Sequence, residues 1–104
     1  MQIQVNSDNH IQSSIRLEEW VRTTIESTLE RYEEDLTRVE VHLRDENGDK
    51  PGPADKRCVM EARLNGRHAS AVTCHAGTFD DAIDGAAEKL KHSIESTLAR
   101  HHER

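Results

Sequence analysis

The clearest pattern of hydrophobic and polar positions lies between Thr78 and Leu98, where apolar residues recur at intervals of three and four. The apolar positions are Phe79, Ala82, Ile83, Ala86, Leu90, Ile94 and Leu98. About twenty residues with this spacing predict an α-helix about 30 Å long with one apolar stripe. Thr78 is the expected N-cap, with Asp80 and Asp81 in the first turn, where the helix dipole favours negative charge. Because the stripe must be covered, the rest of the chain is expected to supply a layer beneath it.

The N-terminal part predicts a strand, a helix and a second strand. Residues 1–5 alternate between apolar and polar side chains, as do residues 39–43, so each segment is expected to form a short strand with one wet face. Between them, apolar residues at helical spacing follow a potential N-cap at Ser14 and predict a helix over residues 15–34. A strand, a helix and a strand in series favour a parallel pair with a right-handed crossover.

A hairpin is expected around Asn65-Gly66, which separates the strand-like segments 58–64 and 67–75. Asn-Gly is the preferred pair for a two-residue type I′ turn, because both central residues need positive φ. With such a turn Met60 would stand opposite Ala71. The core face would then hold Met60, Ala62, Leu64, Ala69 and Ala71 together with Cys58. The other face would hold Val59, Glu61, Arg63, His68, Ser70, Val72 and Cys74.

The predicted element order is strand, helix, strand, strand, strand, helix. The economical packing is an α+β domain in which a four-stranded mixed sheet carries both helices on one face and leaves the other face open. We expect a single domain over residues 1–104, with a mobile loop at 45–57, where both prolines lie, and a frayed tail at 100–104.

The composition favours a non-catalytic protein of the cytoplasm. No apolar run could span a membrane, no signal peptide is evident, and Cys58 and Cys74 are too few for a disulfide scaffold. No nucleophile elbow, phosphate loop or zinc-protease motif occurs, so neither an enzyme nor a small-molecule substrate is expected. We also expect no cofactor and no metal, because the hairpin register above sends Cys58 and Cys74 to opposite faces of the sheet.

The charge balance restricts any nucleic-acid interface to local patches, because the net charge is −6. Residues 1–37 hold three basic and eight acidic residues, residues 38–76 seven and six, and residues 77–104 four and six. Phosphate is neutralised by Lys and Arg, so clusters of these residues are what matters. One candidate cluster follows the hairpin, at Arg44, Arg63, Arg67 and His68. The other follows the last helix, at Lys89, Lys91, His92 and Arg100.

Several sequence features together resemble a known family. These are the strand order, the Asn65-Gly66 hairpin followed by alternating alanines, the segments 29–32 and 81–85, and Glu88-Lys89-Leu90. Over nearly its whole length the chain resembles the short ribosome hibernation promoting factors, also called ribosome-associated inhibitor A or sigma-fifty-four modulation protein. The resemblance implies a β-α-β-β-β-α fold similar to double-stranded RNA-binding domains. It also implies binding to the decoding region of the small ribosomal subunit and inhibition of translation during stress or stationary phase.

The resemblance and the charge pattern together select a set of RNA-binding residues. Lys89 and Arg31 match basic positions of the family. The full expected set is Arg31, Arg63, Arg67, His68, Lys89, Lys91, His92 and Arg100. The expected partner is the small ribosomal subunit with its RNA. The alternative is an interaction module on the same fold that has lost RNA binding and associates weakly with itself or with another protein through the open sheet face, using Val59 and Val72.

Overall fold

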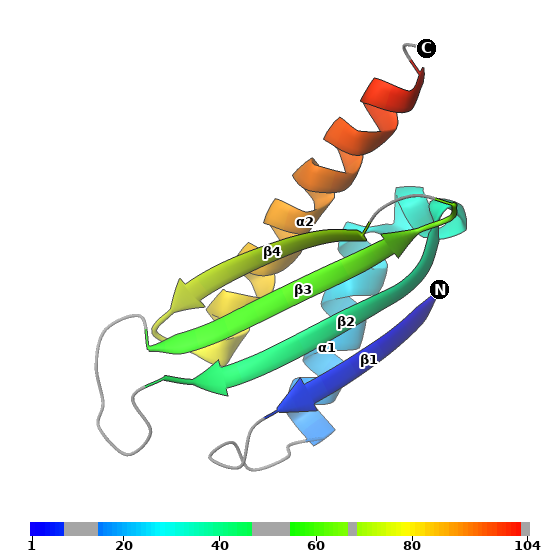
Figure 1. Cartoon of the computed structure of the whole chain (residues 1–104). Coiled ribbons are helices and arrows are strands. Elements are labelled where there is room, and N and C mark those ends of the chain that lie inside the picture. The colour runs from blue at the N-terminus through cyan, green and yellow to red at the C-terminus, as the bar shows by residue number, and fades with distance from the viewer. Residues whose placement is uncertain (8–14, 47–54, 67–68, 103–104) are drawn as a thin grey trace.

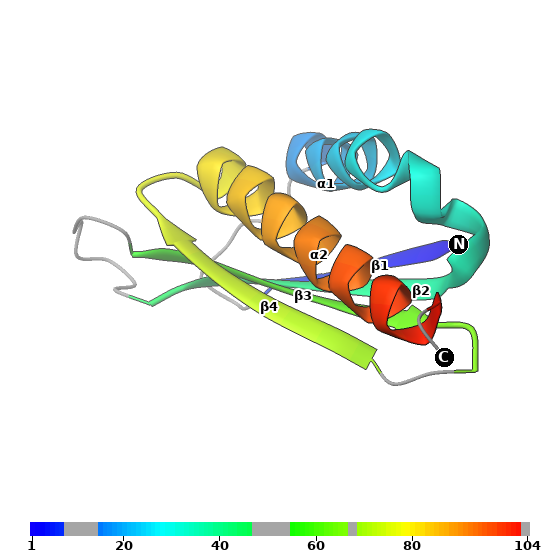
Figure 2. The same cartoon turned by 90° about the horizontal axis from the view of Figure 1, so that it is seen from above.

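The computed structural model describes residues 1–7, 15–46, 55–66 and 69–102. Its elements, in chain order, are β1 (Gln2–Ser7), α1 (Ile15–Thr28), the 3-10 helix η1 (Glu30–Asp35), β2 (Leu36–Asp45), β3 (Lys56–Leu64), β4 (Ala69–Ala76) and α2 (Phe79–His102). The four strands form one sheet in the order β1-β2-β3-β4. Both helices lie on the same face of this sheet, α1 over the β1 side and α2 over the β4 side (Figure 1, Figure 2). The predicted α+β fold class is therefore confirmed.

The sheet is mixed, as predicted. β1 runs parallel to β2, with Ile3 opposite Val39 and Val5 opposite Val41. β2 and β3 are antiparallel, as are β3 and β4. β1 and β4 are the two edge strands, so α2 lies beside one free edge of the sheet.

The core fills the space between the helices and the covered face of the sheet. The stripe predicted for α2 is buried, and Ile83, Leu90 and Ile94 are fully inaccessible. α1 contributes Leu17, Val21 and Ile25. The strands contribute Val39, Val41, Leu43, Cys58, Met60, Ala62 and Leu64. Side-chain hydrogen bonds also tie α1 and η1 to α2. The Arg16 guanidinium donates two hydrogen bonds to the Asp80 carboxylate at 3.1 and 3.2 Å, and the Tyr32 hydroxyl donates to Glu95 at 2.8 Å.

The first helix is shorter than the predicted 15–34. α1 ends at Thr28, and η1 follows after Leu29, whose φ of −105° and ψ of 12° depart from α-helical geometry. Glu30, Glu33, Glu34 and Asp35 all lie in η1. Negative charge near the carboxyl end of a helix opposes the helix dipole, which gives a physical reason for the α-helix to stop early.

The predicted hairpin register is wrong by one residue. Met60 stands opposite Val72 rather than Ala71, and Cys58 stands opposite Cys74. Because side chains alternate along a strand, this shift exchanges the two faces of β4. Val72 and Cys74 therefore pack against the core, whereas the alanines at 69 and 71 are exposed on the open face.

Contacts made by Asn65 account for the register. Its backbone N–H donates to the carbonyl oxygen of Asp35, and its side-chain amide donates to that of Glu34 at 2.8 Å. The amide oxygen accepts a hydrogen bond from the Thr37 hydroxyl at 2.6 Å. Asn65 is thus held against the corner between η1 and β2, next to an irregularity in the β2–β3 pairing. Gly66 has the positive φ expected of the turn, 66°.

The remaining boundaries differ modestly from the sequence-based ones. Thr78 caps α2 as predicted, because its hydroxyl oxygen accepts the backbone N–H of Asp81 at 3.1 Å. β2 extends through Asp45 and β3 begins at Lys56, so these ends of the predicted loop 45–57 are strand. Residues 47–54 and the predicted cap Ser14 lie outside the described residues. α2 continues to His102, into the segment expected to fray.

Candidate nucleic-acid interface

Three of the predicted RNA-binding residues lie on one side of α2. Lys89, His92 and Arg100 are separated by three and eight positions, which places them on the same side of an α-helix. All three are exposed, and about 16 Å of helix separates the first from the last. Lys91 is half-buried, and its position two residues after Lys89 places it about 200° away around the helix. The structure therefore divides the predicted helix cluster between two sides.

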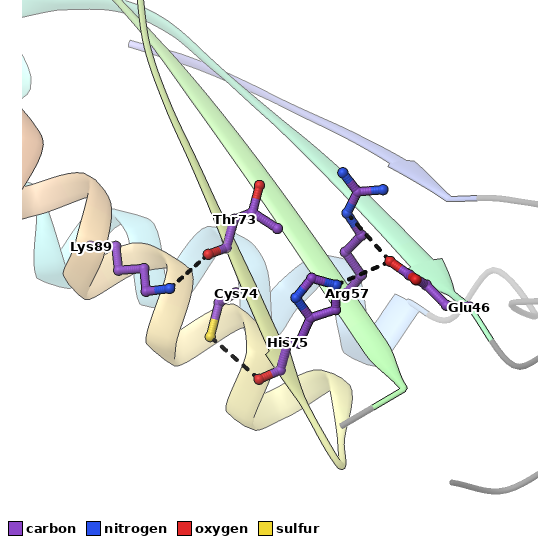
Figure 3. Close-up of polar contacts among 6 residues, drawn as sticks. All are labelled: Glu46, Arg57, Thr73, Cys74, His75 and Lys89. Carbon is purple, nitrogen blue, oxygen red and sulfur yellow. Dashed lines mark hydrogen bonds and ion pairs between the residues drawn. The ribbon is translucent and has the colours of Figure 1, made fainter. Parts of the chain in front are cut away.

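Lys89 is fixed at the free edge of the sheet. Its Nζ atom donates a hydrogen bond to the backbone carbonyl oxygen of Thr73 on β4, at 2.8 Å (Figure 3). An ammonium group has three donors, so this contact leaves two for other acceptors. The side chain remains exposed. Lys89 therefore presents a positioned positive charge beside the edge strand.

Close packing of α2 on β4 brings Lys89 to this edge. Gly85, one turn earlier, lies against Cys74, and a Cβ atom at that position would come within 2.5 Å of the Cys74 sulfur. Glycine therefore allows the helix and the strand to approach closely at this point.

His92 and Glu95 lie close together on the same helix. The His92 side chain is 76 % exposed, and its Nδ1 atom lies 3.7 Å from Glu95 Oε1. The other oxygen of Glu95 accepts the Tyr32 hydroxyl, and this hydrogen bond is the main reason that the pKa of Tyr32 is raised. The Glu95 carboxylate thus contacts both His92 of this group and Tyr32 of η1.

The other predicted residues are not gathered with Lys89. Arg31 is exposed on η1. Arg63 is exposed on the open sheet face, directly opposite Arg38. Arg67 and His68 lie outside the described residues. The expected set is therefore spread over α2, η1 and the open face.

The predicted set omitted two residues that the register brings together on the open face. Arg57 stands opposite Arg44 on one side and His75 on the other. The sequence had marked Arg44 as a candidate, but Arg57 was assigned to a loop, and the predicted register gave His75 no partner. The available signal was that Arg57, as a polar residue before Cys58, continues the alternation of residues 58–64 by one position.

The cysteine pair does not have the geometry that the sequence predicted. Cys58 and Cys74 are directly opposite each other and face the same side, so the argument that they point apart is wrong. Both are free thiols. Burial, with a further contribution from the neighbouring Cys74, raises the pKa of the Cys58 thiol to about 12. Because zinc binds thiolate, a thiol held protonated is a poor ligand. Within the described residues, no three His, Cys, Asp or Glu side chains gather in a way that could hold a metal ion.

Comparison with known proteins identifies the family to which the chain belongs. Residues 3–103 match the family model described as Sigma 54 modulation protein / S30EA ribosomal protein. The chain therefore belongs to this family of ribosome-associated proteins, which confirms the resemblance seen in the sequence. A search of curated proteins found no match. In the part of the chain that the structure describes, no helix is long and apolar enough to cross a membrane.

Solved structures share the fold at low sequence identity. A ribosomal subunit interface protein from Coxiella burnetii superposes with a TM-score of 0.78 at 14 % identity, covering 95 % of this chain and 99 % of that one. The N-terminal domain of Thermus thermophilus Protein Y superposes with a TM-score of 0.74 at 18 % identity, covering 93 % of this chain and 99 % of that one. The fold is thus retained although most side chains differ.

Proposed function

We propose that this protein is a non-catalytic cytoplasmic factor that binds the decoding region of the small ribosomal subunit through ribosomal RNA and inhibits translation during stress or stationary phase. Family membership supports association with the ribosome, and one structural neighbour is named as a subunit interface protein. The observation that carries the RNA contact is the line of Lys89, His92 and Arg100 along α2. Lys89 is held in place by the edge strand.

The net negative charge does not oppose this interface, because four of the five acidic residues of α2 precede Lys89 and the fifth, Glu95, accepts a hydrogen bond from Tyr32. Asp80, Asp81, Asp84 and Glu88 precede Lys89 in the chain, and Asp80 is paired with Arg16. Arg100 lies about 30 Å along the helix from Asp80, well beyond the screening length of about 8 Å at physiological salt. RNA would therefore meet the local charge of the C-terminal half of α2 rather than the average charge of the protein.

The proposal is tested by Lys89→Glu. Binding to purified small subunits should weaken by about tenfold or more, and the dependence of log affinity on log salt should become shallower by about one. Co-sedimentation across a salt series measures both quantities. Arg22→Glu is the matched control, because it makes the same change in net charge on α1, where the proposal places no contact. Equal losses in the two variants would attribute the effect to overall charge, and retention of Lys89→Glu at wild-type levels would contradict the proposal.

The alternative is self-association or protein binding through the open sheet face, using Val59 and Val72. Only one of these two valines lies on that face. Val72 packs against the core, so Val59 is left as a half-buried valine among charged side chains. Among the described residues of β3 and β4 on that face, Val59 is joined only by the small Ala69 and Ala71, which would make a small apolar interface core. Sedimentation equilibrium would separate the readings, because the alternative requires a concentration-dependent increase in mass whereas the proposed function does not.

A further inference from the structure

The covered face of the sheet contains two thiols that face each other across β3 and β4. Cys58 and Cys74 are the two cysteines of the chain, both are free, and they stand directly opposite in the antiparallel pairing. Neither thiol contributes to the RNA interface proposed above. Two thiols placed in this way can undergo a reaction that a single thiol cannot, which is closure to an intramolecular disulfide.

The strand pairing sets the distance between the two backbones. Directly opposite residues of antiparallel strands have Cα atoms about 4.5 or 5.5 Å apart, and disulfides join Cα atoms about 4.4 to 6.8 Å apart. Their Cβ atoms, about 4.5 to 5.5 Å apart in such pairs, must approach to about 4 Å. β4 is an edge strand, so this small approach disturbs its pairing with β3 alone. A bridge therefore needs no change in register or strand direction.

Burial differs between the two sulfurs and sets the order in which they react. Cys58 is fully inaccessible, whereas Cys74 is half-buried on the edge strand. Burial, with a contribution from the nearby Cys74, raises the pKa of the Cys58 thiol to about 12, so this thiol is protonated at neutral pH. The thiolate is the nucleophilic form of cysteine. An oxidant from solvent therefore meets Cys74 first, and Cys58 reacts with a group already attached to the protein.

The sulfur of Cys74 has room to turn. It lies 3.8 Å from the carbonyl oxygen of His75 (Figure 3), and it fills the space that a side chain at Gly85 would take, 2.5 Å from the position of a Cβ atom there. A thiol is a weak hydrogen-bond donor, so the contact with His75 opposes rotation only slightly. Another staggered rotamer about the Cα–Cβ bond moves the sulfur away from α2 and toward the paired strand.

We propose that Cys58 and Cys74 form a peroxide-responsive pair that closes to a reversible disulfide between β3 and β4 in the folded protein. The Cys74 thiolate attacks one oxygen of hydrogen peroxide, which breaks the O–O bond and gives a sulfenic acid and hydroxide. The Cys58 sulfur then attacks the sulfenic sulfur, and its proton leaves with the displaced hydroxide as water. In total the two thiols lose two electrons and two protons, and hydrogen peroxide is reduced to two molecules of water.

Closure would act on the strand that positions Lys89. Thr73, whose carbonyl oxygen accepts the hydrogen bond from Lys89, immediately precedes Cys74. The disulfide would link the edge strand covalently to β3 beside this residue, and thiol exchange with a reductant would open it again. The covered face thus carries an oxidation site that is separate from the charged side chains of the proposed interface.

The experiment treats the folded protein with hydrogen peroxide and follows its intact mass and its free thiols. The wild-type protein should lose the mass of two hydrogen atoms and both thiols, remain without intermolecular disulfides, and regain both thiols with dithiothreitol. Oxygen added to Cys74 while Cys58 remains a thiol would overturn the proposal. So would two unreacted thiols under conditions that oxidise the unfolded chain, or a disulfide between two molecules. The assay needs no ribosome, so its result is independent of the proposed function.

Single variants test the order of reaction. In Cys58→Ala the sulfenic acid on Cys74 has no partner, so its trapping by dimedone should rise by about tenfold or more over the wild type. In Cys74→Ala the remaining thiol is inaccessible and should react with peroxide about tenfold or more slowly than Cys74 does in Cys58→Ala. Equal reaction rates of the two thiols would contradict the assignment of Cys74 as the first to react.

A displaced thiol provides the matched control for geometry. The double variant Cys74→Ala with Thr73→Cys keeps two thiols but moves one to the open face, opposite Val59. In the folded state its bridging to Cys58 should be slower than in the wild type by about tenfold or more. Bridging in concentrated urea, where the register is lost, calibrates the intrinsic reactivity of the two proteins. Equal bridging in the folded state would overturn the proposal, because the disulfide would then arise from unfolded chains.

Discussion

The two faces of the sheet are built from the same strands but have opposite chemistry. On β3, Met60 is fully buried beneath the helices, while its neighbour Val59 lies half-buried on the open face between charged rows. The covered face holds aliphatic side chains and two thiols, and the open face holds arginines, glutamates and histidines. Neighbouring residues of a strand therefore have different roles, because one packs in the core and the next lies among the charged side chains of the open face.

The difference between the two faces suggests that residues on one face determine stability and residues on the other determine binding. Side chains on the covered face are tightly enclosed, so changes there should alter the free energy of unfolding. Charged side chains on the open face and along the β4 edge are partly solvated, so changes there should alter binding while the fold persists. The predictions below test the covered face, from the largest expected effect to the smallest.

Leu90→Ala should have the largest effect. Leu90 is fully buried in the middle of the α2 stripe, and its truncation should lower the free energy of unfolding by about 2 to 5 kcal/mol through lost burial and a residual cavity. Val59→Ala on the open face is the control and should cost less than about 1 kcal/mol. Urea unfolding followed by circular dichroism measures both. Similar losses in the two variants would remove the distinction between the faces.

An intermediate effect is expected from the titration of Cys58. Its pKa is raised from 9.0 to about 12 in the folded protein, so between these values the unfolded chain loses a proton that the folded chain keeps. Stability should therefore be intact below about pH 9 and fall as pH rises, by about 1.4 kcal/mol per unit. Cys58→Ala should flatten this decline when chemical unfolding is repeated between pH 8 and 10.5. Parallel declines in the two proteins would show that the thiol is not the cause.

The smallest effect, and the one that best tests the packing of α2 on β4, concerns Gly85. Gly85→Ala should destabilise the protein by about 1 kcal/mol, because the added Cβ would meet the Cys74 sulfur at 2.5 Å. In a Cys74→Ala background that clash is absent, and the same substitution should stabilise by up to about 1 kcal/mol through helix propensity. The reversal of sign, measured by thermal unfolding, is the expected result. The same sign in both backgrounds would mean that the sulfur does not limit this contact.

Much of the candidate interface followed from residue spacing, and the rest depended on strand pairing. Lys89, His92 and Arg100 share a helix side because their spacing fixes it once the helix exists. Lys91 was grouped with them by proximity in the chain, although a displacement of two residues turns a side chain about 200° around the helix. That Arg57 and His75 lie side by side on the open face became evident only from the register of β3 with its two neighbouring strands.

By itself, the sequence determined the element order, the buried stripe of α2, the cap at Thr78 and the α+β class, because each depends on local periodicity or local hydrogen bonding. It did not determine the face on which β4 side chains lie. Asn65-Gly66 favoured a two-residue turn, but Asn65 instead forms hydrogen bonds to Glu34, Asp35 and Thr37, residues that are distant in the chain. Those contacts exist only when η1 and the hairpin meet in space. The tertiary structure therefore decided that Val72 and Cys74 face the core and that His75 joins Arg57 on the open face, because a register is set by contacts at both ends of a strand and a turn preference is set at only one.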